Sequence, residues 1–166
     1  MTGARLAHVA VIGAGDAGPD DLVVAEDLGR ELATRGAVVV CGGLGGVMEA
    51  VCRGAQTAGG RTIGILPGDD RHQANPHVDV AVATGLGEAR NLLVVRTADV
   101  VIAVGGEFGT LSEIAFALRL GIPVVGIGTW ELAQRGRPVD PIVRVATAAD
   151  AADAAFQAIL RNTTSE

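Results

Sequence analysis

A glycine turn followed by Thr110 and Glu113 is the part of this chain best suited to chemistry. The sequence DVVIAVGGEFGTLSEIAFAL begins with an apolar run typical of a buried parallel strand and continues into a helical pattern. Between them, Gly105, Gly106 and Gly109 allow a sharp turn. Backbone N–H groups, the Thr110 hydroxyl and the positive end of the helix would then point at one spot, which attracts phosphate. We expect this turn to hold the phosphate of a small molecule.

Arg90 and Glu113 are the side chains that could act on such a ligand. Arg90 lies near the start of an expected helix, beside Glu88 and Asn91, and an arginine there can hold a phosphate or a sugar through several donors. A solvated or ion-paired residue is the alternative for Arg90. Glu113 has an alternative too, because T-x-x-E at a helix start is a capping box in which Glu113 accepts the Thr110 N–H. The sequence leaves both alternatives open.

The first glycine turn reads GxGxxG, with Gly13, Gly15 and Gly18 after an apolar strand pattern. This spacing occurs in dinucleotide-binding folds. Two features argue against that reading: the helical pattern begins only after Pro19, and Cys41 stands where a ribose-binding carboxylate would end the second strand. We therefore expect no nicotinamide cofactor, although the turn can still contact a ligand.

A second glycine turn contains Gly42, Gly43 and Gly46, again between a strand pattern and a helical pattern. Its structural alternative is close packing of a strand and a helix, which uses glycines without any ligand. The two turns should lie side by side at one edge of a sheet, so together they favour a shared phosphate or nucleotide cleft.

Strand and helix patterns alternate from end to end, which predicts a doubly wound, mostly parallel sheet in a three-layer, Rossmann-like α/β fold. We expect one domain over residues 1–166, without linkers or repeats. The expected strands span residues 7–12, 37–40, 61–66, 78–83, 100–104, 122–127 and 142–145. The expected helices span residues 20–35, 47–57, 88–97, 111–120 and 147–161, and residues 130–141 are expected to be irregular.

The composition of the chain argues against several classes of partner. A net charge of −6 argues against a nucleic-acid surface, and no apolar run is long enough to span a membrane. The first residues pass straight into a strand pattern, so we expect no signal peptide and a cytoplasmic protein. Cys41 and Cys52 have neither metal-ligand nor redox-motif spacing, and His8, His72 and His77 form no cluster. We expect no metal.

All 13 basic residues are arginines, and the chain also lacks tyrosine. Without lysine there is no Walker-type phosphate lysine and no Schiff base to pyridoxal phosphate. We expect the protein to use no cofactor of its own. Its partner should be a small molecule, either a nucleotide or a phosphorylated cofactor that it binds as a ligand.

Two of these segments resemble motifs of the Lonely Guy (LOG) superfamily. GGEFGTLSE, residues 105–113, is similar to that family's PGGxGTxxE, and GGLGGVMEA, residues 42–50, is similar to its glycine–methionine motif, which adds Met48 to the site. A family arginine upstream of the glutamate corresponds to Arg90. The resemblance implies a homodimer with a cleft for nucleoside 5′-monophosphates. It also implies hydrolysis of the N-glycosidic bond, which releases a free base.

The chain departs from the family pattern at four positions. Gly105 replaces the motif proline and Glu107 its second glycine, while Glu88 and Asn91 stand where the family has a histidine and a lysine. These changes resemble an outlying branch of bacterial proteins and molybdenum-cofactor carriers, which hold a phosphorylated pterin without turning it over. Glu107 also adds negative charge next to the proposed phosphate turn.

Two functions from different classes follow. The leading hypothesis is a phosphoribohydrolase acting on a purine riboside 5′-monophosphate, either AMP or a cytokinin riboside monophosphate. Glu113 would stabilise the oxocarbenium-like charge and activate water, and Arg90 would hold the substrate and keep Glu113 ionised. The alternative is a carrier or sensor of a phosphorylated cofactor or nucleotide that does no chemistry. Release of free base separates the two.

Overall fold

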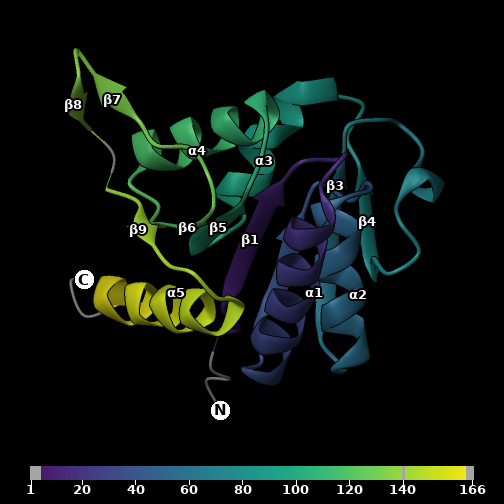
Figure 1. Cartoon of the computed structure of the whole chain (residues 1–166). Coiled ribbons are helices and arrows are strands. Elements are labelled where there is room, and N and C mark those ends of the chain that lie inside the picture. The colour runs from purple at the N-terminus through teal and green to yellow at the C-terminus, as the bar shows by residue number, and fades with distance from the viewer. Residues whose placement is uncertain (1–4, 140, 164–166) are drawn as a thin grey trace.

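The computed structural model describes residues 5–139 and 141–163. Its main sheet has seven strands in the order β4-β3-β2-β1-β5-β6-β9, and every described strand pair in it is parallel (Figure 1). The strands of this sheet are β1 (His8–Gly13), β2 (Val38–Cys41), β3 (Arg61–Leu66), β4 (Val80–Ala83), β5 (Val100–Val104), β6 (Val124–Ile127) and β9 (Val143–Arg144). The helices are α1 (Pro19–Thr34), α2 (Val47–Thr57), α3 (Asn91–Arg96), α4 (Phe108–Leu120) and α5 (Ala148–Thr163).

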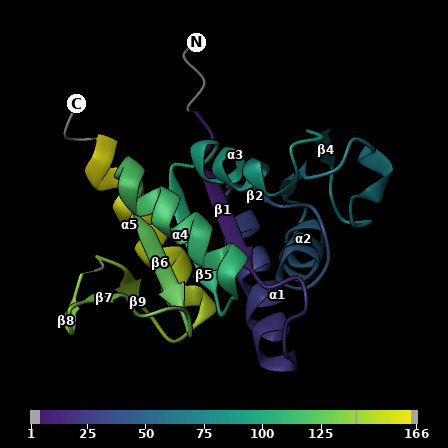
Figure 2. The same cartoon turned by 90° about the horizontal axis from the view of Figure 1, so that it is seen from above.

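Helices cover the sheet on both faces, as the predicted three-layer α/β class requires (Figures 1 and 2). One core lies between the sheet and α1, α2 and α5, and the other lies between the sheet and α3 and α4. The central strands are apolar runs with both faces buried, so successive residues of β5 alternate between the two cores. This is the arrangement that a doubly wound parallel sheet needs.

The order of the strands reverses direction beside β1. The chain builds β2, β3 and β4 outward on one side and then returns to place β5 on the other side of β1. Ligands of such sheets bind at this switch point, beyond the carboxyl ends of the strands. Gly13, the last residue of β1, pairs with Val104, the last residue of β5. The turns after these two strands therefore start at the same level of the sheet.

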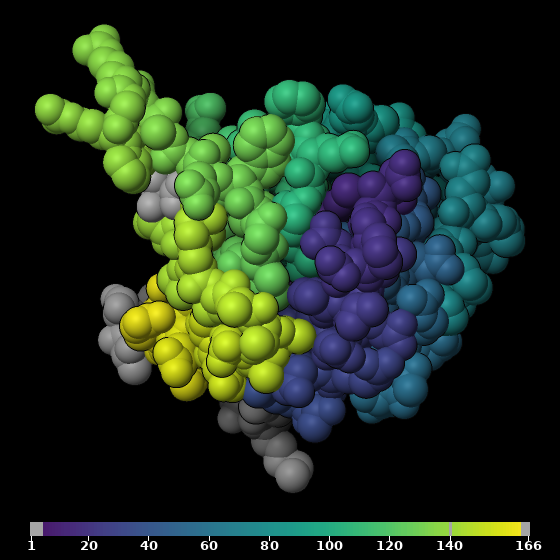
Figure 3. All heavy atoms as spheres, in the orientation of Figure 1, coloured from purple at the N-terminus to yellow at the C-terminus, as the bar shows by residue number. Residues whose placement is uncertain are grey.

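Three segments differ from the expected elements. Residues 130–141 are not irregular throughout, because β7 (Ala133–Gln134) and β8 (Arg137–Pro138) form an antiparallel hairpin. Its central residues, Arg135 and Gly136, have φ of 52° and 76°, the backbone of a tight hairpin turn. Arginine is uncommon at such a position, so the residue pattern did not predict this turn. The hairpin stands out from the body of the molecule (Figure 3).

The other two differences are at helix starts. The helix expected over residues 88–97 is a 3₁₀ turn at Gly87–Arg90 followed by α3. Helix α4 begins at Phe108 rather than at residue 111, which changes the position of Thr110 and Glu113 within it. In the described part of the chain, no helix has both the length and the apolar character needed to span a membrane.

Candidate functional site

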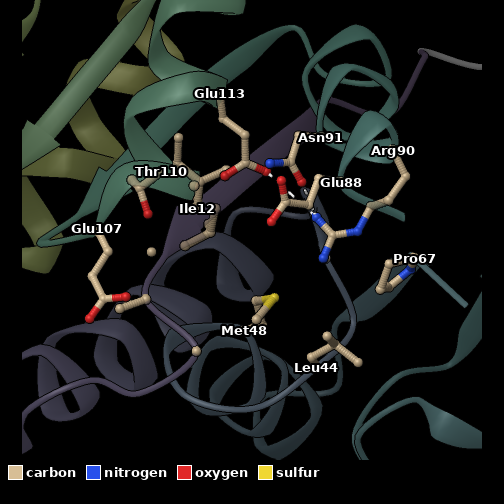
Figure 4. Close-up of a pocket in the computed structure, with 16 residues that line it drawn as sticks. Ile12, Leu44, Met48, Pro67, Glu88, Arg90, Asn91, Glu107, Thr110 and Glu113 are labelled. Carbon is tan, nitrogen blue, oxygen red and sulfur yellow. Dashed lines mark hydrogen bonds and ion pairs between the residues drawn. The ribbon is translucent and has the colours of Figure 1, made fainter. Parts of the chain in front are cut away.

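A cavity of about 290 Å³ opens at the carboxyl edge of the sheet, where β1, β2 and β5 end (Figure 4). The cavity lies at the switch point of the strand order, where the glycine turns predicted a ligand-binding cleft. Nine of the thirteen residues proposed from the sequence line it: Gly13, Gly15, Gly42, Met48, Arg90, Asn91, Gly109, Thr110 and Glu113. The other four, Gly43, Gly46, Gly105 and Gly106, do not.

Helix α4 presents its first turn to the cavity without a cap of its own. Glu107 is the N-cap residue, yet no side chain caps the helix, and the first backbone bond runs from the Leu111 N–H to the Glu107 carbonyl. Thr110 is therefore inside the first turn rather than at the cap position, so the capping-box alternative for Glu113 is wrong. The N–H groups of a first turn have no partner inside the helix, and Gly109 and Thr110 bring theirs to the cavity wall.

Gly105 and Gly106 shape the turn before α4. Their φ values are 53° and 113°, which favour glycine. A Cβ on Gly106 would lie 2.5 Å from the Thr110 Cβ, and a Cβ on Gly105 would lie 2.2 Å from an oxygen of the Asp21 carboxylate. These glycines therefore let Thr110 and α1 approach the turn closely. Gly105 and Gly106 do not line the cavity themselves, whereas Gly109 and Thr110 do.

The glycines of the second turn, between β2 and α2, have different roles: one allows close packing and another lines the cavity. A Cβ on Gly46 would lie 2.2 Å from the Ala14 carbonyl oxygen, and the Val47 N–H donates to that same oxygen at 3.1 Å. Gly46 thus serves close packing between the two turns. Gly42 serves the cavity, because a Cβ there would lie 2.8 Å from Nη2 of Arg90. The absence of a side chain at Gly42 makes room for the guanidinium.

Arg90 comes from the 3₁₀ turn before α3 and is only 9% exposed. Its Nη1 donates to the side-chain oxygen of Asn91, while its Nε has no hydrogen-bond partner among the described residues. A buried N–H of this kind normally has a partner. The Nε is itself buried, so a ligand in the cavity would meet other atoms of Arg90, which lines the cavity wall.

A short chain of hydrogen bonds holds Asn91, and through it Arg90, in place. The Asn91 amide nitrogen donates to the Ser112 hydroxyl at 3.2 Å, and that hydroxyl donates to the Gly109 carbonyl at 2.6 Å. The chain links the guanidinium to the first turn of α4. Ser112 was missed from the sequence because nothing in its local pattern distinguishes it from a surface serine.

Glu113 lies in the same wall and is 6% exposed, with its Oε1 4.0 Å from Nη1 of Arg90. Burial raises the pKa of its carboxyl to about 8, and the nearby positive charge of Arg90 offsets only part of this effect. Burial also lowers the pKa of Arg90. The expectation that Arg90 keeps Glu113 ionised is therefore wrong: at neutral pH the unliganded carboxyl is mostly protonated.

Comparisons with known proteins show which family the chain belongs to. A model of the SLOG cluster4 family matches residues 6–154. The chain belongs to the SLOG cluster4 family. A relative in Archaeoglobus fulgidus, described as an uncharacterized protein, is 42% identical over 123 residues, which are 74% of this chain and 81% of that protein.

Two solved structures resemble this SLOG cluster4 protein over most of their length. The molybdenum cofactor binding protein of Rippkaea orientalis is 35% identical with a TM-score of 0.84, over 95% of this chain and 99% of that one. The molybdenum cofactor carrier protein of Chlamydomonas reinhardtii is 32% identical with a TM-score of 0.79, over 94% of this chain and 99% of that one.

The cavity of this SLOG cluster4 protein is richer in carboxyl groups than the sequence predicted. Glu88 and Glu107, both exposed, line it together with buried Glu113, against the single guanidinium of Arg90. Within the described residues, no three His, Cys, Asp or Glu side chains are grouped so as to hold a metal ion. Apolar residues complete the wall, and those not predicted from the sequence are Val11, Ile12, Ala14, Leu44 and Pro67.

Proposed function

We propose that this protein binds a phosphorylated pterin of the molybdenum-cofactor class and carries it without turning it over. The observation that carries the proposal is the buried Arg90, the one guanidinium of the described residues that lines the cavity at the switch point of the sheet. A guanidinium carries only donors, so a ligand beside it should supply acceptors. The similarity to two molybdenum cofactor proteins supports the choice of ligand.

The phosphate would rest on the first turn of α4. Gly109 and Thr110 line the cavity there, and the positive end of the helix favours an anion. The pterin would lie against Leu44 and Met48, which supply apolar surface on the opposite wall (Figure 4). Glu113, mostly protonated at neutral pH, adds little repulsion to an incoming anion. A protonated carboxyl is also a poor catalyst for a reaction that develops positive charge.

The experiment is an anaerobic titration of the protein with molybdenum cofactor, followed by gel filtration. The fluorescence of Trp130 is a built-in signal, because it is the only tryptophan and its indole N–H donates to the Glu107 carbonyl at 3.2 Å, just before α4. We expect a stoichiometric complex from which intact cofactor can be recovered. The variant Arg90→Met should lose at least tenfold in affinity. Arg96→Met is the matched control, since Arg96 is an exposed residue of α3 outside the cavity.

Phosphoribohydrolase activity, as in the wider LOG superfamily, is the second candidate. The observation that favours it is that Arg90 and Glu113 are buried together in the cavity, 4.0 Å apart. Hydrolysis would require the Glu113 carboxylate, so the rate should rise with pH toward about 8, where this group ionises. Incubation with AMP and with isopentenyladenosine monophosphate tests the candidate. Base release no greater than that of Glu113→Ala would exclude it.

A further inference from the structure

The cavity has two unlike ends. Thr110 and Glu107 stand at one end and Arg90 and Pro67 at the other, with Glu113 between them on the upper wall (Figure 4). The first end lies at the start of α4, where no side chain caps the helix and the first-turn N–H groups have no partner inside it. The second end offers one guanidinium and the carboxyl groups of two glutamates. A ligand that fills the cavity must therefore match two different sets of polar groups.

The Arg90 end is unsuited to a phosphate. Glu113 lies 4.0 Å from the guanidinium. Glu88 also points toward it (Figure 4) and is close enough to raise the pKa of Arg90 by its charge. An anion bound to Arg90 would meet the charge of Glu88, and a carboxylate accepts hydrogen bonds but donates none. The part of the ligand at this end should therefore be uncharged, with an acceptor for Arg90 and N–H donors for the glutamates.

The geometry points to a heterocycle whose edge carries a ring carbonyl, a ring N–H and an amino group. This 2-amino-4-oxo edge is shared by pterins and guanine. Arg90 donates to the carbonyl, while Glu113 and Glu88 accept from the ring N–H and the amino group. The inference rests on the proposed function, since the phosphate at the start of α4 directs the ring toward Arg90. Glu88 and Glu113 are thereby specificity-determining residues.

The Arg90 guanidinium is held in place for this task before the ligand arrives. Asn91 accepts from Nη1, and Ser112 fixes the orientation of the Asn91 amide. Arg90 lines the cavity in this fixed position. When a buried polar group of a site hydrogen-bonds to the ligand, an analogue without the matching group binds more weakly, because the buried group is left unpaired. Adenine has no ring carbonyl and hypoxanthine has no amino group, so both leave part of this set unpaired.

The test compares three nucleotides that share the same sugar and phosphate. Full-length protein is titrated at pH 7 with GMP, IMP and AMP, using Trp130 fluorescence and calorimetry. We expect GMP to bind at least tenfold more tightly than IMP or AMP. Glu88→Gln should weaken GMP about tenfold and change IMP less than threefold, because IMP lacks the amino group. Glu113→Ala should weaken GMP and IMP alike, about tenfold, because both carry the ring N–H. Glu31→Gln, on α1 outside the cavity, is the matched control, and each variant is checked for an unchanged circular dichroism spectrum.

The possible results separate failure of this inference from failure of the proposed function. Equal affinities for the three nucleotides, or tightest binding of AMP, would overturn the inference and leave the phosphate site in place. Binding of molybdenum cofactor with no response to any nucleotide would also overturn it. If neither the nucleotides nor the cofactor bind, the proposed function itself fails.

Discussion

The Arg90 guanidinium lies 4.0 Å from the Glu113 carboxyl but donates its hydrogen bond to Asn91 instead. Two opposite charges that are buried together usually form a close pair, because each unpaired buried charge is costly. Here the guanidinium has an amide partner and the carboxyl takes up a proton. The site therefore holds a cation beside a neutral acid, which repels an anion bound at the start of α4 less than a charged carboxylate would.

The raised pKa of Glu113 predicts a pH-dependent stability. The carboxyl has a pKa of about 8 in the folded protein against 4.5 as the reference value, so between these limits the folded state binds more protons than the unfolded state. The free energy of unfolding should fall as pH rises from about 4.5 to 8, by at most on the order of 5 kcal/mol. This contribution is fully present below the lower limit and lost above the upper one. Urea unfolding at pH 5, 6, 7, 8 and 9 measures it.

The matched variant for this prediction is Glu113→Gln, which has the same shape and no proton to lose. Its unfolding free energy should depend less on pH than that of the natural protein over the same range. Parallel profiles for the two proteins would show that Glu113 ionises near its ordinary pKa. Water would then reach the Glu113 carboxyl more easily than its 6% exposed surface indicates.

Glu107 should weaken the binding of a phosphate. Its exposed carboxylate stands at the end of the cavity beside the first turn of α4 (Figure 4). Like charges at short range repel, and water screens only part of this effect. Glu107→Gln should therefore tighten inorganic phosphate roughly threefold to tenfold at low salt, as followed by Trp130 fluorescence. The gain should shrink as salt is added. Unchanged affinity would mean that the phosphate binds away from α4.

Much of this site could be predicted from the sequence, because the argument needed only topology. Apolar runs and glycine turns predicted a parallel sheet, and parallel strands bring their carboxyl ends to one edge. That reasoning placed Arg90 and Glu113 in one cavity although 23 positions separate them.

The protonation of Glu113 could not be predicted, since it depends on how closely neighbouring residues exclude water. The role of Gly46 in packing, rather than in binding, also depends on a distance: its backbone approaches Ala14 too closely for a side chain. The start of α4 was misplaced because Glu107 and Phe108 are ordinary residues at a helix start that has no side-chain cap. That the Nε of Arg90 has no hydrogen-bond partner among the described residues can be seen only in the three-dimensional structure.

A methyl group at Gly42 should remove binding while leaving the fold largely intact. The Cβ of Gly42→Ala would lie 2.7 Å from the Met48 sulfur and 2.8 Å from Nη2 of Arg90, and both are ends of flexible side chains. They would shift into the cavity. We expect at least a tenfold loss of affinity for the ligand and a destabilisation of no more than about 1–3 kcal/mol.

Gly18→Ala is the control for this prediction, because Gly18 has φ of −68° and no atom within 4 Å of its added Cβ. It should bind and unfold like the natural protein. If Gly42→Ala binds equally well, then Arg90 has room to retreat and the close contact at Gly42 has no bearing on the ligand.

The two cysteines should be unreactive in the native protein. The Cys41 and Cys52 sulfurs lie 3.5 Å apart, and both residues are fully buried between β2 and α2. The two thiols share a hydrogen bond, which together with burial raises the pKa of the Cys52 thiol and by itself lowers the pKa of Cys41, and neither sulfur is accessible. A thiol reacts only as an accessible thiolate, so labelling by an aromatic disulfide reagent should be slow, at the rate at which the protein opens. Both thiols should react at once in 6 M guanidinium, which supplies the control. Rapid labelling of even one thiol without denaturant would mean that α2 separates from β2 easily, and the glycine turn between them could then no longer be a rigid wall of the cavity.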